Sequence, residues 1–142
     1  MNQKRIRIKL YTLSALLTGL FLLLPGPSLA PSEKVLFIAH RGGIMPGYPE
    51  NTLAAFRQAI KLGAGVIEID LRGSKDGEIV IMHDETVDRT TNGHGRVAEH
   101  TLAELLQLDA GQGESIPTFA QVLELVQGTD AQLLTDITAG RP

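Results

Sequence analysis

Four short polar clusters between positions 40 and 84 carry the residue types that acid–base and metal chemistry needs. Each cluster lies at the end of an apolar run, or just beyond it, where a strand is expected to pass into a loop. This placement predicts an active site. The clusters are His40-Arg41-Gly42-Gly43, Pro49-Glu50-Asn51-Thr52, Glu68-Ile69-Asp70 and His83-Asp84.

Glu68 and Asp70 lie two residues apart in an apolar run. Because the side chains of a strand alternate between its faces, both carboxylates are expected to point the same way. Like charges this close repel each other unless a cation neutralises them, and a divalent cation that prefers oxygen ligands can do so. The alternative is a solvated edge face of the sheet, and a motif this short does not decide between the two.

His40 and His83 each follow an apolar run that predicts a strand. Loops at the C-terminal ends of strands build the active sites of α/β proteins, and two imidazoles there can divide the roles of general base and general acid. A single histidine so placed is more often an ordinary loop residue, but two that flank a pair of carboxylates favour catalysis. His94, in a turn, and His100, before a helix cap, are interpreted as structural or solvated.

Arg41 can present a guanidinium fork to a phosphate group. Its alternative interpretation is an ion pair with Glu50, and both hold if Glu50 keeps Arg41 in place. Gly42 and Gly43 allow a close approach of the backbone, or serve only to adopt a positive φ.

The order of the expected elements indicates an α/β fold. A continuous apolar run at 35–39 predicts a strand buried on both faces, and helix signals follow at 51–63. Strands are also expected at 66–71, 78–83 and 131–137, the second of these after a turn at 75–77. Capping boxes at 101–104 and 118–121 open two helices, so strands and amphipathic helices form βα units around a parallel sheet. The second helix is expected to bury one face, made of Phe119, Val122, Leu123 and Val126.

Residues 1–30 have the three-part layout of a secretory signal peptide. Basic residues precede an uncharged run at 10–24, and small residues and prolines follow it. The run is shorter than the roughly 20 residues that a membrane-spanning helix needs. We therefore expect export to the periplasm or the medium, with cleavage after Ser28 or Ser32. The alternative is an uncleaved segment that anchors the protein in the membrane.

The rest of the chain, expected to be one domain at 34–142, is acidic. The first 30 residues hold four of the 13 basic side chains and none of the 16 acidic ones, so the remainder has a formal charge of −7. An acidic surface argues against a nucleic-acid partner. It allows an anionic substrate, because a bound divalent cation can invert the local field. The chain has no cysteine, which excludes disulfide and thiolate chemistry.

Taken in order, these motifs resemble the glycerophosphodiester phosphodiesterase family. The shared pattern is H-R-G, P-E-N-T, E-x-D, K-D-G-x-x-V-x-x-H-D and D-R-T-T-x-G, and the similarity runs from Leu36 to about Asp136. The resemblance implies a (β/α)8 barrel of the TIM type and a divalent metal ion, usually Ca²⁺ or Mg²⁺. It also implies a small-molecule substrate, because the family hydrolyses glycerophosphodiesters to an alcohol and glycerol 3-phosphate.

The resemblance further implies a role for each matched catalytic or phosphate-binding position. His40 and His83 match the family's two catalytic histidines. Arg41 matches its phosphate-facing arginine, and Glu50 matches the glutamate that supports the loop.

The implied metal ligands are Glu68 and Asp70, with Asp136 on the next barrel strand. At that last position the family commonly has Glu-x-Lys, whereas this chain has Asp136-Ile137-Thr138. A shorter carboxylate therefore replaces the glutamate, and part of the phosphate contact lacks its lysine.

Two other functions stay open at this point. A related barrel enzyme that cleaves phospholipid head groups would share the histidines and the E-x-D motif, although membrane substrates favour apolar loops and 41–50 offers little beyond Ile44, Met45 and Tyr48. The other is a truncated, non-catalytic secreted chain. A closed barrel takes about 250 residues, so we expect this chain to hold the N-terminal portion of the domain and, alone, to be inactive and to associate.

Overall fold

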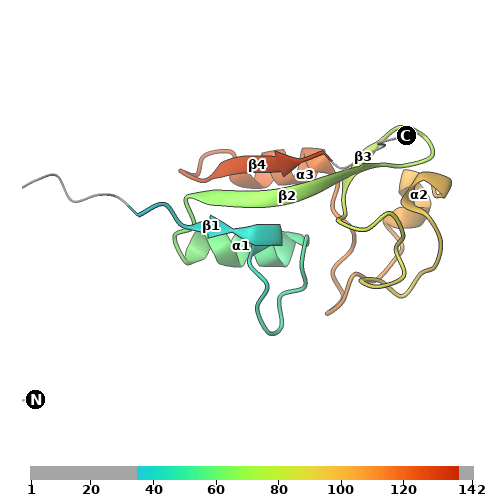
Figure 1. The fold of residues 1–142 in the computed structure, drawn as a ribbon, viewed down its shortest axis with the longest axis horizontal. Coiled ribbons are helices and arrows are strands. Elements are labelled where there is room, and N and C mark those ends of the chain that lie inside the picture. The colour runs from blue at the N-terminus through green and yellow to red at the C-terminus, as the bar shows by residue number, and fades with distance from the viewer. Residues whose placement is uncertain (1–34, 138–142) are drawn as a thin grey trace, which may run out of the picture. The chain divides into compact units, whose positions relative to one another are not determined.

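The computed structural model describes residues 35–137, which form a four-stranded sheet with helices against it (Figure 1). The expected signal peptide at 1–30 lies outside the described residues, as does Thr138. In chain order the elements are β1 (Ile38–Ala39), the 3-10 helix η1 (His40–Gly42), α1 (Leu53–Lys61), β2 (Val66–Gly73), β3 (Ile79–Ile81), the 3-10 helix η2 (Val97–Glu99), α2 (Leu102–Leu105), α3 (Phe119–Val126) and β4 (Gln132–Asp136).

Strand β2 is the centre of the sheet. It pairs in parallel with β1 on one side and β4 on the other, as Figure 1 shows, and its C-terminal end pairs antiparallel with β3. Its residues from Val66 to Leu71 are all buried. Since β2 has a neighbour on each side, the sheet fixes its backbone and so determines the face on which each polar side chain lies.

The two faces of β2 have different contents. Ile67 and Ile69 point into a hydrophobic core that they share with Phe56 of α1 and Val122 of α3. Because side chains alternate along a strand, Glu68 and Asp70 point to the opposite face. The period-2 pattern of the sequence thus separates the core from the polar site.

Local helix signals are confirmed. The Thr52 hydroxyl accepts a hydrogen bond from the backbone N–H of Ala55 at the start of α1, and both expected capping boxes form at Thr101 and Thr118. The expected core face of α3 is wrong at Leu123, which is exposed. Val122 fixes the buried face, and Leu123 lies one helical step of about 100° away from it. None of the helices in the described part of the chain is long and apolar enough to cross a membrane.

The strand predicted at 35–39 is shorter and less buried than expected. Only Ile38 and Ala39 pair in β1, and the apolar residues from Val35 to Ile38 are exposed, by 52 to 89%. Burial on both faces needs neighbours on both sides, and within residues 35–137 β1 has a strand neighbour on one side alone. An unpaired apolar edge of this kind favours association with another chain. The self-association expected from the sequence stays a prediction.

Candidate active site

Three carboxylates converge where β2 and β4 lie side by side. The parallel register places Asp70 beside Asp136, and Glu68 lies two residues earlier on the same face. One oxygen from each of the three lies within 4.8 Å of the others. Glu68 and Asp70 are buried, whereas Asp136 is exposed. Burial excludes the solvated edge face as an interpretation of the E-x-D motif.

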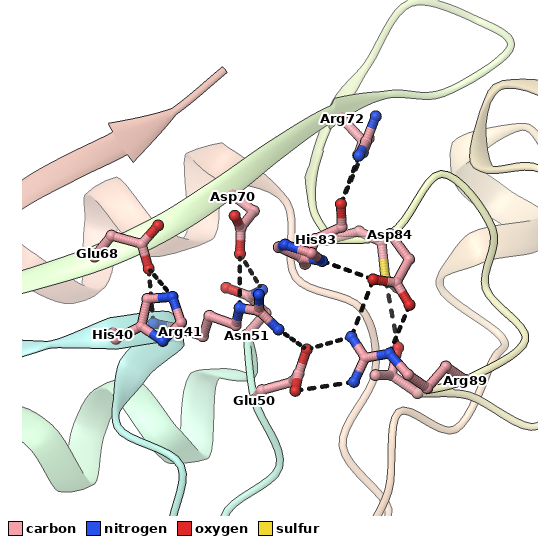
Figure 2. Close-up of polar contacts among 12 residues, drawn as sticks. His40, Arg41, Glu50, Asn51, Glu68, Asp70, Arg72, His83, Asp84 and Arg89 are labelled. Atoms are coloured by element: carbon pink, nitrogen blue, oxygen red, sulfur yellow. Dashed lines mark hydrogen bonds and ion pairs between the residues drawn. The ribbon is translucent and has the colours of Figure 1, made fainter. Parts of the chain in front are cut away.

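Residues of the segment between β1 and α1 fix the two buried carboxylates (Figure 2). The backbone N–H of Arg41 donates to Glu68 Oε2 at 2.8 Å, and Asn51 Nδ2 donates to Asp70 Oδ2 at 2.8 Å. Asn51 Oδ1 is buried and has no hydrogen-bond partner among the described residues. The three carboxylates form an oxygen-only donor set, which is the kind that Ca²⁺ and Mg²⁺ prefer.

This segment adopts an unusual backbone to make those contacts. Arg41 and Asn51 have φ values of 51° and 56°, in the left-handed region that L-residues rarely adopt. Gly42 has a φ of +82°, and a Cβ there would lie 2.6 Å from Phe56 Cδ1. Both interpretations of Gly42, positive φ and close approach, are therefore correct. Strain of this kind is often found at functional sites, where the surrounding structure maintains it.

His40 directly follows β1 and lies beside the carboxylates. Its Nε2 is 4.0 Å from Glu68 Oε2, and its side chain is 63% exposed. The imidazole is therefore open to solvent and to any ligand of the acidic cluster.

His83 reaches the site by a different route from the one predicted. The sequence suggested that both histidines lie at equivalent strand ends, with a turn at 75–77 before the second strand. β1 is parallel to β2, but β3 is antiparallel to it, so the two ends are not equivalent. The hairpin turns the chain back, and the backbone N–H of Met82 donates to the carbonyl oxygen of Asp70 at 3.0 Å. His83 is thus placed near the C-terminal half of β2 by the return of a hairpin, not by the end of a parallel strand.

A row of ion pairs connects the two parts of the site (Figure 2). Arg41 Nη1 donates to Glu50 Oε1 at 3.2 Å, which confirms the expected ion pair, and Arg41 Nε is 3.7 Å from Asp70 Oδ2. Arg89 Nη2 donates to the same Glu50 oxygen at 2.7 Å, and Arg89 Nε donates to Asp84 Oδ2 at 2.6 Å. Asp84 Oδ1 lies 2.6 Å from His83 Nδ1.

These contacts change the ionisation of both acidic members. The hydrogen bond from Arg89 is the main cause that lowers the pKa of Glu50, with Arg41 adding to it. Arg89 is also the first cause, ahead of His83, that holds the pKa of Asp84 well below its usual range. The two carboxylates in turn raise the pKa of Arg89. All three groups are therefore charged at neutral pH.

Sequence reasoning gave no role in the site to three residues of this arrangement, although the motifs contain all three. Asn51, in P-E-N-T, precedes Thr52, which caps α1. Asp84 directly follows a candidate catalytic histidine, and this position is a signal for a partner of the imidazole. Arg89 belongs to D-R-T-T-x-G, but no local pattern predicts its partner Glu50, which is 39 residues away in the sequence. His94 is exposed and pairs with Asp88, as expected of a histidine outside the site.

Comparison with known proteins relates this geometry to one family. Residues 40–139 match the model of the Glycerophosphoryl diester phosphodiesterase family. A glycerophosphodiester phosphodiesterase of Caldanaerobacter subterraneus is 49% identical over 114 residues, covering 75% of this chain and 46% of the relative. Human glycerophosphodiester phosphodiesterase 1 is 42% identical over 132 residues, covering 78% of this chain and 40% of the relative. The chain thus spans less than half the length of these relatives.

Solved structures agree with the sequence matches. An Oleispira antarctica phosphodiesterase in complex with the product sn-glycerol-3-phosphate superposes with a TM-score of 0.70 and 39% identity, covering 75% of this chain and 45% of that one. An Agrobacterium tumefaciens glycerophosphodiester phosphodiesterase gives a TM-score of 0.68 and 37% identity, covering 73% and 47%. The predicted fold class is confirmed: the described residues form βα units of a (β/α)8 barrel.

Proposed function

Because the chain belongs to the glycerophosphoryl diester phosphodiesterase family, we propose that it carries the metal-binding and acid–base residues of a phosphodiester hydrolase. The proposed reaction cleaves glycerophosphodiesters to an alcohol and glycerol 3-phosphate. The observation that carries the proposal is the buried pair Glu68 and Asp70, which lies with Asp136 in one acidic cluster beside His40. The Oleispira relative, solved with sn-glycerol-3-phosphate, supports the substrate class.

Ca²⁺ or Mg²⁺ is the proposed ion of the acidic cluster. Glu68, Asp70 and Asp136 would hold it. Asn51 donates to Asp70 through Nδ2, and its buried Oδ1 has no hydrogen-bond partner among the described residues. Zn²⁺ fits less well, because it favours cysteine and histidine ligands. When bound, such an ion withdraws negative charge from a phosphate oxygen as a Lewis acid.

The side chains around the cluster supply the remaining chemistry. One histidine removes a proton from the nucleophile, either water or a neighbouring glycerol hydroxyl, and the other donates a proton to the departing alkoxide. Because Asp84 is ionised and can only accept, His83 Nδ1 carries a proton and donates it to that carboxylate. Nε2 of His83 is then the nitrogen left for proton transfer. Arg41, held by Glu50, shares the negative charge of the phosphate.

Hydrolysis of glycerophosphocholine is the direct test. In a protein that carries the complete domain, we expect release of glycerol 3-phosphate in the presence of Ca²⁺ or Mg²⁺, loss of activity on chelation, and recovery when either ion is returned. Residues 1–142 alone are expected to be inactive. Parallel assays with vesicles of sphingomyelin or phosphatidylinositol test the alternative of a phospholipid head-group phosphodiesterase. Turnover of the vesicles alone would support that alternative, and the absence of turnover on every substrate, in the complete domain as well, would support a non-catalytic protein.

Export is a separate part of the proposal. The basic, apolar and small-residue segments within 1–30 support a periplasmic or secreted protein, with membrane attachment only if that segment stays uncleaved. Fractionation of cells and N-terminal sequencing of the recovered protein test this. A cytoplasmic protein that retains Met1 would contradict it. The acidic charge of the rest of the chain supports the absence of a nucleic-acid partner.

A further inference from the structure

Arg89 binds two carboxylates that each hold a different functional side chain (Figure 2). Its Nε and Nη2 donate to the two oxygens of Asp84 at 2.6 and 3.1 Å. Its Nη1 and Nη2 donate to the two oxygens of Glu50 at 3.1 and 2.7 Å. The guanidinium of Arg89 therefore makes two hydrogen bonds to each of two carboxylates, Asp84 beside His83 and Glu50 beside Arg41.

We propose that Arg89 is a positioning residue, which orients His83 through Asp84 and Arg41 through Glu50 and so keeps the two parts of the site in register. The inference rests on the proposed function for its catalytic consequence, but not for the geometry that it assigns. Among the described residues, the side-chain hydrogen bonds and ion pairs of Arg89 go to Asp84 and Glu50, and none goes to the acidic cluster, His83 or Arg41.

The chemistry of the partners supports an orienting role. Asp84 Oδ1 accepts both from Arg89 and from His83 Nδ1, so the position of this oxygen sets the direction of the imidazole. Glu50 Oε1 likewise accepts both from Arg89 and from Arg41. A planar guanidinium can bind two carboxylates with paired, directed bonds, whereas a lysine ammonium is a point charge without that fork.

The surroundings distinguish this contact from an ordinary surface salt bridge. The Arg89 side chain is 48% exposed, but those of Glu50 and Asp84 are only 14% and 26% exposed. Arg96 provides a matched comparison, because it makes one bond to Glu85 at 3.0 Å and both side chains are about 60% exposed. Among the described residues, the Glu85 side chain has no hydrogen bond or ion pair with a residue of the site, so Arg96 makes the same kind of ion pair without positioning a functional side chain.

The tautomer of His83 is the sharpest test, since it needs no substrate and no metal. We would label the histidine ring nitrogens of the full chain with ¹⁵N and record their NMR spectra at about pH 8, above the ordinary pKa of an imidazole. In the parent we expect the Nδ1–H form of His83. In Arg89→Met we expect a mixture in which the Nε2–H form increases, because Asp84 no longer has a fixed direction. In the control Arg96→Met we expect the parent spectrum.

Activity and a second variant complete the test. If the parent hydrolyses glycerophosphocholine, Arg89→Met should lower kcat about 10- to 100-fold, the range seen when residues that orient a functional group are removed, and Arg96→Met should not. Circular dichroism shows whether Arg89→Met folds. If it does not, Arg89→Lys, which keeps the charge but lacks the guanidinium fork, tests the positioning role instead. We expect it to lose the parent tautomer in part.

The Nδ1–H form at parent level in a folded Arg89→Met, or in Arg89→Lys, would overturn the proposal. So would loss of that form in Arg96→Met, because the effect would then be general to the loop. Absence of turnover in a protein that carries the complete domain would contradict the proposed function alone, and the tautomer comparison would still decide the role of Arg89.

Discussion

The two histidines occupy regions of the site that are built differently. His40 lies on η1 beside the buried carboxylates, is largely exposed, and has Glu68 at 4.0 Å as its ion-pair partner. His83 lies beyond β3, and its Nδ1 is 2.6 Å from a carboxylate that Arg89 also binds. The His83 imidazole thus has a short contact with a carboxylate, whereas the His40 imidazole lies close to the proposed metal ligands without a short contact.

The two histidines illustrate two ways in which the direction of a catalytic imidazole can be fixed. A carboxylate on one ring nitrogen fixes the tautomer and direction of an imidazole before any substrate binds. An exposed imidazole beside a cation site gains its direction only when the ligand arrives. The region around His83 is therefore organised in advance, whereas the region around His40 depends on what binds the acidic cluster.

The largest expected effects come from removing either imidazole. In a complete version of this domain, His40→Ala and His83→Ala should each lower kcat by at least about 10²-fold, the usual scale of general acid–base catalysis. Asp84→Asn should lower kcat by removing the carboxylate that contacts His83 Nδ1, and should leave metal binding unchanged. His94→Ala is the matched control, because His94 pairs with Asp88 outside the site. Full activity in either alanine variant, with an unchanged circular dichroism spectrum, would remove that histidine from the mechanism.

The next effect concerns the acidic cluster beside His40. Glu68→Gln combined with Asp70→Asn should weaken Ca²⁺ binding by more than about 100-fold, beyond the 10- to 100-fold typical of outer residues. Isothermal titration calorimetry measures this. The control is Glu85→Gln combined with Asp130→Asn, which changes the charge equally at two exposed acids outside the acidic cluster. Equal affinity in the double variant and the parent would show that the ligand assignment is wrong.

Gly42, next to His40, tests how strongly the fold enforces that region. Gly42→Ala should reduce the free energy of unfolding by about 2–3 kcal/mol, because a left-handed φ costs an L-residue about 1–2 kcal/mol and overpacking adds to it. Gly77→Ala is the control: its φ is +87°, but nothing lies within 4 Å of the added Cβ. Denaturant unfolding gives both values, and equal losses would show that the contact with Phe56 relaxes without cost.

The smallest effect is the pH dependence of the region around His83. Glu50 and Asp84 have lowered pKa values in the folded protein, so their contribution to stability is present above their unfolded values of about 4 and is lost as the pH falls through the lower folded values. Arg89→Met should therefore cost stability at pH 6 to 7, by no more than about 1 kcal/mol because Arg89 is half exposed. The difference from the parent should shrink towards about pH 2. A difference independent of pH would contradict an electrostatic origin.

Several features of this protein follow from the sequence alone. The two-residue spacing of Glu68 and Asp70 within an apolar strand predicts one shared face, and the capping boxes at Thr101 and Thr118 predict two helix starts. These signals act over two to four residues, within reach of strand alternation and of a single helical turn. For the same reason the α/β fold class could be predicted.

Other features depend on the tertiary structure. The exposure of β1 depends on its neighbours, which an apolar run does not specify. The position of Asp136 beside Asp70 is decided by the register of β4 on β2, and that of His83 by the antiparallel return of β3. Arg89 meets Glu50 across 39 residues, since the loop beyond β3 lies against the segment before α1. Local propensity does not determine such contacts, because they form only when the path of the whole chain brings distant charges together.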